Sequence, residues 1–137
     1  MYLVVDTWVW EKAQRGESLA SLELLAKIYR KCEYRIIYDY DGEILDEYKN
    51  HIRELPIIRM FRLMTQTGKM IPRPKSNIEI KDFDKSDLKF IQVAITTPNT
   101  LIISGNSDFL ELKKRLEKNK KLKEVKILTP EEALNVL

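Results

Sequence analysis

Four polar positions lie beside apolar runs of the sequence, where strands are expected to end or helices to begin. They are Asp6, Glu47, Asp87 and Asn106. In a parallel sheet the carboxyl ends of the strands share one edge, so side chains far apart in the sequence can meet there. Carboxylate and amide oxygens are hard ligands that suit Mg²⁺ or Mn²⁺. The pattern therefore predicts a metal-binding pocket in which an amide stands where a fourth carboxylate is expected.

Such a pocket has a direct chemical use. Crowded carboxylates repel one another, and a bound divalent cation relieves that repulsion. A water on the cation is more acidic than bulk water and can attack a phosphodiester, while the cation neutralises charge on the phosphate oxygens. This chemistry needs no cysteine or histidine, so we expect the lone Cys32 to be a half-buried structural thiol and the lone His51 to be a surface residue.

The elements that position these residues follow from hydrophobic periodicity. Short apolar strands alternate with amphipathic helices, which predicts parallel β-α-β units. Strands are expected at residues 2–5, 35–38, 100–103 and 125–128. Helices are expected from the Ser18 cap to Arg30-Lys31, from the Asp41-Gly42 turn through Ile52, from Pro56 to Thr67-Gly68, from 84 to 95, from a Ser107-Asp108 cap to about Asn119, and from Thr129 onward. Residues 69–79, which contain Pro72 and Pro74, are expected to be an irregular connection.

Read in order, four segments resemble the successive motifs of PIN-domain ribonucleases. They are Val4-Val5-Asp6-Thr7 and residues 43–48, 84–94 and 101–110. Residues 125–132 extend the resemblance, which then covers nearly the whole chain. It is closest to the small prokaryotic PIN proteins, which include the toxins of VapBC-type toxin–antitoxin pairs.

The resemblance implies a three-layer α/β fold, with a central parallel sheet of four to five strands flanked by helices. It also implies an acidic pocket for Mg²⁺ or Mn²⁺ and RNA as the substrate. The first three acids of the family fall on Asp6, Glu47 and Asp87, which we expect to be catalytic and to bind the metal ion. Glu43 and Asp84 lie nearby and remain alternatives for the second and third acids.

The fourth acid of the family falls on Asn106, and the second acid of that stretch is retained as Asp108. Both are expected at the metal site, with the hydroxyl groups of Thr7 and Ser104 supporting the ligands. An amide lacks one formal charge, which at ~4 Å from a cation is worth on the order of 4 kcal/mol at an effective dielectric near 20. We therefore expect weak activity or a preference for Mn²⁺. Asp108 either adds a ligand or caps the following helix, and the sequence leaves both open.

Basic residues gather between Lys49 and Lys75, where they offer a surface for a phosphate backbone. The residues expected to bind RNA are Arg53, Arg59, Arg62, Lys69 and Arg73. The alternative to a nuclease is a degenerate PIN domain that acts as an RNA-binding or protein-interaction module. Trp8, Trp10 and Phe61 are then candidates for stacking on bases, although both tryptophans also suit a core or a dimer contact.

Length and composition set the remaining expectations. The 137 residues suit a single domain, 1–137, and the 44% hydrophobic and 33% charged composition indicates an ordered globular chain. The sequence has no leader-like N-terminus and no apolar run near the ~20 residues of a bilayer span, so we expect a cytoplasmic protein without a membrane partner. The expected partners are RNA, an antitoxin protein if the chain is a toxin, and a second copy in a homodimer.

Overall fold

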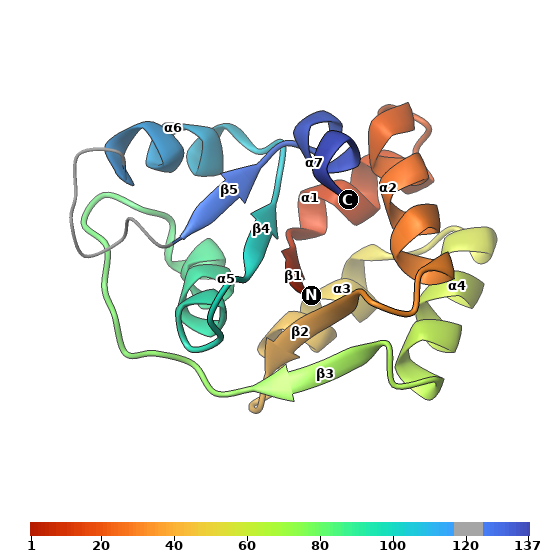
Figure 1. The fold of residues 1–137 in the computed structure, drawn as a ribbon, viewed down its shortest axis with the longest axis horizontal. Coiled ribbons are helices and arrows are strands. Elements are labelled where there is room, and N and C mark those ends of the chain that lie inside the picture. The colour runs from red at the N-terminus through yellow and green to blue at the C-terminus, as the bar shows by residue number, and fades with distance from the viewer. Residues whose placement is uncertain (117–124) are drawn as a thin grey trace.

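The computed structural model describes residues 1–116 and 125–137. Within these residues the chain forms a five-stranded, fully parallel sheet in the order β3-β2-β1-β4-β5, flanked by helices (Figure 1). The strands are β1 (Tyr2–Val5), β2 (Arg35–Asp39), β3 (Met70–Arg73), β4 (Leu101–Ile103) and β5 (Lys126–Leu128). The helices are α1 (Thr7–Gln14), α2 (Leu19–Arg30), α3 (Glu43–His51), α4 (Leu55–Gln66), α5 (Lys85–Ile95), α6 (Ser107–Leu116) and α7 (Pro130–Val136).

The helices form a layer on each side of the sheet. α5 packs against β1, β2 and β4, and α6 packs against β5. α1 packs against α2 and α3, and α2 also contacts α7. Figure 1 shows α5 and α6 on one side of the sheet and α1, α2, α4 and α7 on the other. This arrangement confirms the predicted α/β fold with a central parallel sheet.

The core follows from this layering. A parallel sheet covered on both faces needs apolar side chains on both, and all three residues from Leu3 to Val5 are fully buried. Trp10 lies at the centre of an aromatic cluster, with ring centroids 5.5 Å from Tyr48 and 5.7 Å from Phe61. Trp10 and Phe61 are buried, so the expectation that they stack on bases is wrong.

Two elements differ from the sequence-based prediction. Residues 70–73, expected within an irregular connection, form edge strand β3, where Pro72 pairs with Tyr38 of β2. An edge strand tolerates proline because the missing N–H can fall on the side without a partner strand. Residues 7–14, for which the sequence suggested no helix, form α1, which begins without a side-chain hydrogen bond from Asp6 to its first turn.

Smaller differences concern ends and single residues. Residues 117–119, the expected end of a helix, lie outside the described residues. Cys32 is exposed rather than half-buried, because it follows the end of α2. His51 is an exposed residue, as expected, and contacts Glu11. None of the helices that the structure describes is both long and apolar enough to cross a bilayer.

The register of the sheet brings three polar residues together at the carboxyl ends of its strands. Leu3 pairs with Ile36 and Leu101, and Val5 pairs with Ile103. The next residue along β1, Asp6, still donates its backbone N–H to the Ile103 carbonyl at 3.0 Å. Asp6, Asp39 and Ser104 consequently lie at the carboxyl ends of β1, β2 and β4.

Candidate metal centre

Asp6 is the most buried carboxylate of the predicted set. It lies between β1 and α1, and the residue is 3% exposed. The Ser104 hydroxyl donates to Asp6 Oδ2 at 2.7 Å, which fixes the carboxylate against the end of β4. Burial raises the pKa of Asp6 to about 7, and the charges of Asp87 and Glu47 add to the rise, while the Ser104 hydrogen bond opposes it. The carboxylate therefore lies where a cation would stabilise it most.

The turn after β4 supports Asp6 through a chain of hydrogen bonds. The Asn106 backbone N–H donates to Ser104 Oγ at 3.0 Å. The Asn106 side-chain oxygen accepts from the Asp108 N–H at 3.0 Å, so Asn106 caps α6 rather than the expected Ser107-Asp108 pair. Gly105, between Ser104 and Asn106, lies directly against the Trp8 ring, and a Cβ at this position would overlap the indole. Trp8 thus packs on the turn that holds Ser104.

Glu47 reaches the same region from α3 and is held from two sides. The Thr7 hydroxyl donates to Glu47 Oε2. The Lys89 ammonium donates to Glu47 Oε1 at 2.8 Å and also to the Ser86 carbonyl. Glu47 raises the pKa of Asp6, whereas Glu43 is not among the causes of that rise. The structure therefore places Glu47, of the two alternatives, beside Asp6.

Asp87 lies in the first turn of α5, beside two other acids. Oxygens of Asp84, Asp87 and Asp108 lie within 4.8 Å of one another. Partial burial raises the pKa of Asp87 to about 6, helped by the charges of Asp84 and Glu47 and opposed by Lys89. Asp84 is exposed, and its carboxylate accepts from the Ser86 N–H at 2.7 Å as the N-cap of α5. Asp87 thus belongs to this outer group and is also close enough for its charge to act on Asp6.

The predicted ligands are therefore brought together only in part. Asp6, Glu47 and Asp87 are close enough for their charges to interact. Across residues 1–116 and 125–137, however, the three are not a group whose oxygens all lie within 4.8 Å of one another. Asp108 joins Asp87, while the Asn106 side-chain oxygen is engaged at the start of α6.

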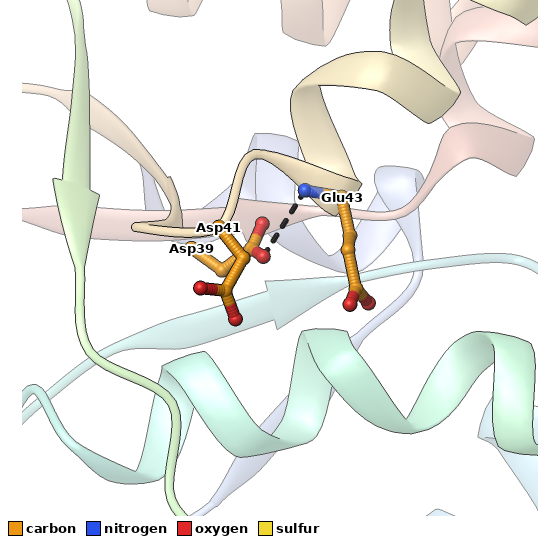
Figure 2. Close-up of side chains that lie close together, drawn as sticks. All are labelled: Asp39, Asp41 and Glu43. Atoms are coloured by element: carbon orange, nitrogen blue, oxygen red, sulfur yellow. Dashed lines mark hydrogen bonds between the residues drawn. The ribbon is translucent and has the colours of Figure 1, made fainter.

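A second acidic group lies at the carboxyl end of β2. Figure 2 shows Asp39, Asp41 and Glu43, with the Glu43 N–H donating to the Asp39 carboxylate. Asp39 is fully buried and also accepts from the Ile44 N–H at 2.9 Å, so it caps α3. Lys75 Nζ lies 3.7, 3.3 and 3.3 Å from Asp39, Asp41 and Glu43 respectively. Lys75 offsets part of the charge of these three acids, and the buried Asp39 carboxylate is engaged at the start of α3, so we interpret this group as a structural cap.

The basic residues assigned to RNA binding separate into two sets. Arg53, Arg59 and Arg62 are exposed, and Arg73 is half-buried with its guanidinium 5.3 Å from the centroid of the Tyr2 ring. Lys69 differs from the expectation, because it is buried and its ammonium donates to the carbonyls of residues 31 and 34. Burial lowers the pKa of Lys69. Its ammonium is therefore turned inward, away from any RNA on the surface.

Sequence reasoning missed Lys89, which is 9% exposed and lies among the predicted ligands. The signal was available, since Lys89 is the one charged residue in the apolar run from Leu88 to Ile95. A buried lysine requires an acidic or polar partner, and the acids already assigned to the pocket, Glu47 among them, were candidates for it.

The donor set fits a hard divalent cation. Asp6, Glu47 and Asp87 offer carboxylate oxygens, the ligands that Mg²⁺ and Mn²⁺ prefer. The pKa values of Asp6 and Asp87 are raised chiefly by burial and further by the charges of neighbouring acids, and a bound cation would oppose both effects. These three side chains are therefore candidate ligands for such a cation.

Comparisons of the chain with protein-family models, with curated proteins and with solved structures find no match.

Proposed function

We propose that the chain is a metal-dependent ribonuclease that hydrolyses RNA phosphodiesters at Asp6, Glu47 and Asp87. The observation that carries this proposal is Asp6 itself, a buried carboxylate at the carboxyl end of a central strand whose pKa is raised to about 7. Two further acids, from α3 and α5, contribute to that rise. Such an arrangement destabilises the protein without a cation, and groups of this kind are typical of functional sites.

Each residue has a distinct part in the proposed reaction. Asp6, Glu47 and Asp87 would hold a Mg²⁺ or Mn²⁺ ion, which supplies an acidic water and neutralises charge on the phosphate. Ser104 keeps Asp6 in one orientation through its 2.7 Å hydrogen bond. Thr7 does the same for Glu47. Ligands held in this way lose little freedom when they bind a cation, which favours affinity.

Support for a nucleic-acid substrate comes from the basic surface. Arg59 and Arg62 are exposed and three residues apart on α4, so they lie on one face of that helix. Arg53 precedes α4 and is also exposed. Arginine side chains bind phosphate in a bidentate manner. We therefore assign these three arginines, with Arg73 at the end of β3, to binding of the RNA backbone.

Cleavage of a labelled single-stranded RNA in Mn²⁺, in Mg²⁺ and in EDTA tests this proposal. The variants are Asp6→Asn, which removes one charge from the site, and Asp41→Asn, which removes one from the Lys75 group. We expect cleavage with either metal ion, none in EDTA, loss of at least 10²-fold in Asp6→Asn, and little change in Asp41→Asn. Cleavage that persists in EDTA or in Asp6→Asn would overturn the proposal.

A second candidate function is a non-catalytic RNA-binding module. Two observations favour it: the Asn106 side-chain oxygen is used as a helix cap, and Glu47 is paired with a lysine. Under this alternative, Arg59→Glu together with Arg62→Glu abolishes RNA binding, while the natural protein binds RNA equally well in EDTA and cleaves none. Binding that requires Mn²⁺ and Asp6 would reject the module and support the nuclease.

A further inference from the structure

Lys89 is a cation built into the acidic pocket. Its ammonium donates to Glu47 Oε1 at 2.8 Å and to the Ser86 carbonyl, and its side chain is 11% exposed. Lys89 also acts on the pKa of Asp87, which it lowers against the combined effect of burial and neighbouring acids. Lys89 therefore supplies positive charge to this group of carboxylates.

This lysine and a metal ion would compete. Glu47 Oε2 accepts from Thr7, and Glu47 Oε1 accepts from Lys89, so both carboxylate oxygens already have hydrogen-bond donors. A divalent cation bound by Glu47 would share its carboxylate with an ammonium group, and the two positive charges would repel each other. The metal ion therefore binds more weakly while Lys89 pairs with Glu47, and more tightly once Lys89 leaves it.

We propose that Lys89 links metal binding to phosphate binding, an inference that rests on the proposed function. In the metal-free protein the ammonium holds Glu47. When a phosphodiester enters the site, the ammonium turns to a phosphate oxygen and leaves Glu47 to the metal ion.

The chemistry of lysine suits this part. Its ammonium is a compact charge on a flexible four-carbon stem with three donors, so it can exchange a carboxylate partner for a phosphate oxygen without a change in the backbone. The exchange makes the affinity for the metal ion depend on bound phosphate, and the affinity for phosphate depend on the bound metal ion. Phosphate removes the competing cation from Glu47, and the metal ion releases the ammonium for phosphate, so each ligand raises the affinity for the other by the same factor.

Calorimetric titration of the metal-free protein with Mn²⁺, with and without a short phosphorothioate oligouridylate, tests this link. The oligonucleotide keeps the backbone charge and resists cleavage. In the natural protein we expect it to tighten Mn²⁺ binding by well over tenfold. Without the oligonucleotide, Lys89→Met should bind Mn²⁺ about tenfold more tightly than the natural protein does. With the oligonucleotide, the two proteins should bind Mn²⁺ about equally, so the coupling in Lys89→Met falls by about tenfold.

Three further variants serve as controls. Lys89→Arg retains the charge and should retain most of the coupling. Lys113→Met removes a lysine that is paired with Glu132 outside the pocket, and should leave both titrations unchanged. If Lys89→Met does not fold, as judged by circular dichroism, Lys89→Gln replaces it, because glutamine is neutral and can still donate to Glu47.

The outcomes separate this inference from the proposed function. Equal coupling in the natural protein and in the neutral variants, with Mn²⁺ bound in each, would overturn the role of Lys89 and leave the metal site standing. No Mn²⁺ binding in any of them would overturn both. Coupling that falls in Lys89→Met and persists in Lys89→Arg would support the link.

Discussion

Replacing Asp6 by asparagine should make the metal-free protein more stable at alkaline pH. The pKa of Asp6 is raised from 3.8 to about 7, chiefly because the carboxyl is buried. A raised pKa means that folding favours the protonated form, so the contribution of this group to stability is complete below pH 3.8 and is lost as the pH rises through 7. Asparagine has nearly the same shape as the protonated acid and carries no charge.

The magnitude follows from the two pKa values. Each pH unit between 3.8 and about 7 changes the free energy of unfolding by about 1.4 kcal/mol, so the ionised Asp6 costs up to about 4 kcal/mol at pH 8 relative to the protonated acid. Asp6→Asn does not lose this stability because asparagine does not ionise, and its side-chain oxygen can still accept a hydrogen bond from Ser104. Its advantage over the natural protein should therefore grow by several kcal/mol between pH 4 and pH 8.

Urea unfolding in EDTA across this pH range, followed by circular dichroism, measures the difference. Asp41→Asn is the matched control, since the side chain of Asp41 is 70% exposed, and its stability should follow that of the natural protein. Parallel curves for Asp6→Asn and the natural protein from pH 4 to pH 8 would refute the reasoning, because they would mean that Asp6 ionises at the same pH in the folded and unfolded states.

Three further variants test other parts of the structure. Asn106→Asp keeps the cap of α6 and adds a negative charge, so calorimetry should show tighter Mn²⁺ binding while the unfolding free energy in EDTA changes by less than about 0.5 kcal/mol; weaker Mn²⁺ binding would contradict this. Gly105→Ala forces the Trp8 ring off the turn and should cost about 1 to 3 kcal/mol in urea unfolding, whereas an unchanged midpoint would show that the ring moves freely. Asp39→Ala leaves two backbone N–H groups of α3 without an acceptor and should lower the free energy of unfolding by about 1 to 3 kcal/mol in the same assay. The control Asp41→Ala, at an exposed residue, should lower it by about 0.5 kcal/mol or less. Equal losses would show that the cap is not structural.

The strands that reach the site were predictable because their apolar runs are continuous. Residues 3–5 and 102–103 are buried, and each apolar run ends at a polar residue. Asp6 and Ser104 could therefore be placed at a shared edge from sequence alone. β3 could not, because Pro72 argues against a strand unless it is known to lie at the edge of the sheet.

The partners of the site residues were harder to predict. Glu47 could be placed near the pocket by helical periodicity, but the pairing of its oxygens with Thr7 and Lys89 depends on how α1, α3 and α5 pack. Lys69 was expected on an RNA-binding surface because it falls in the basic stretch between Lys49 and Lys75, yet two backbone carbonyls bind its ammonium in the interior. The sequence alone cannot reveal such carbonyls, since every residue has one.

The position of a bound Mn²⁺ ion tests the central claim most directly. Crystals grown without metal and soaked in Mn²⁺ would locate the ion by its anomalous scattering. We predict a peak within coordination distance of Asp6, with Glu47 and Asp87 as further ligands and the Lys89 ammonium displaced from Glu47 only when a phosphate analogue is also bound. A peak confined to the Asp39 group, or none at millimolar Mn²⁺, would contradict the assignment of this pocket as a metal centre.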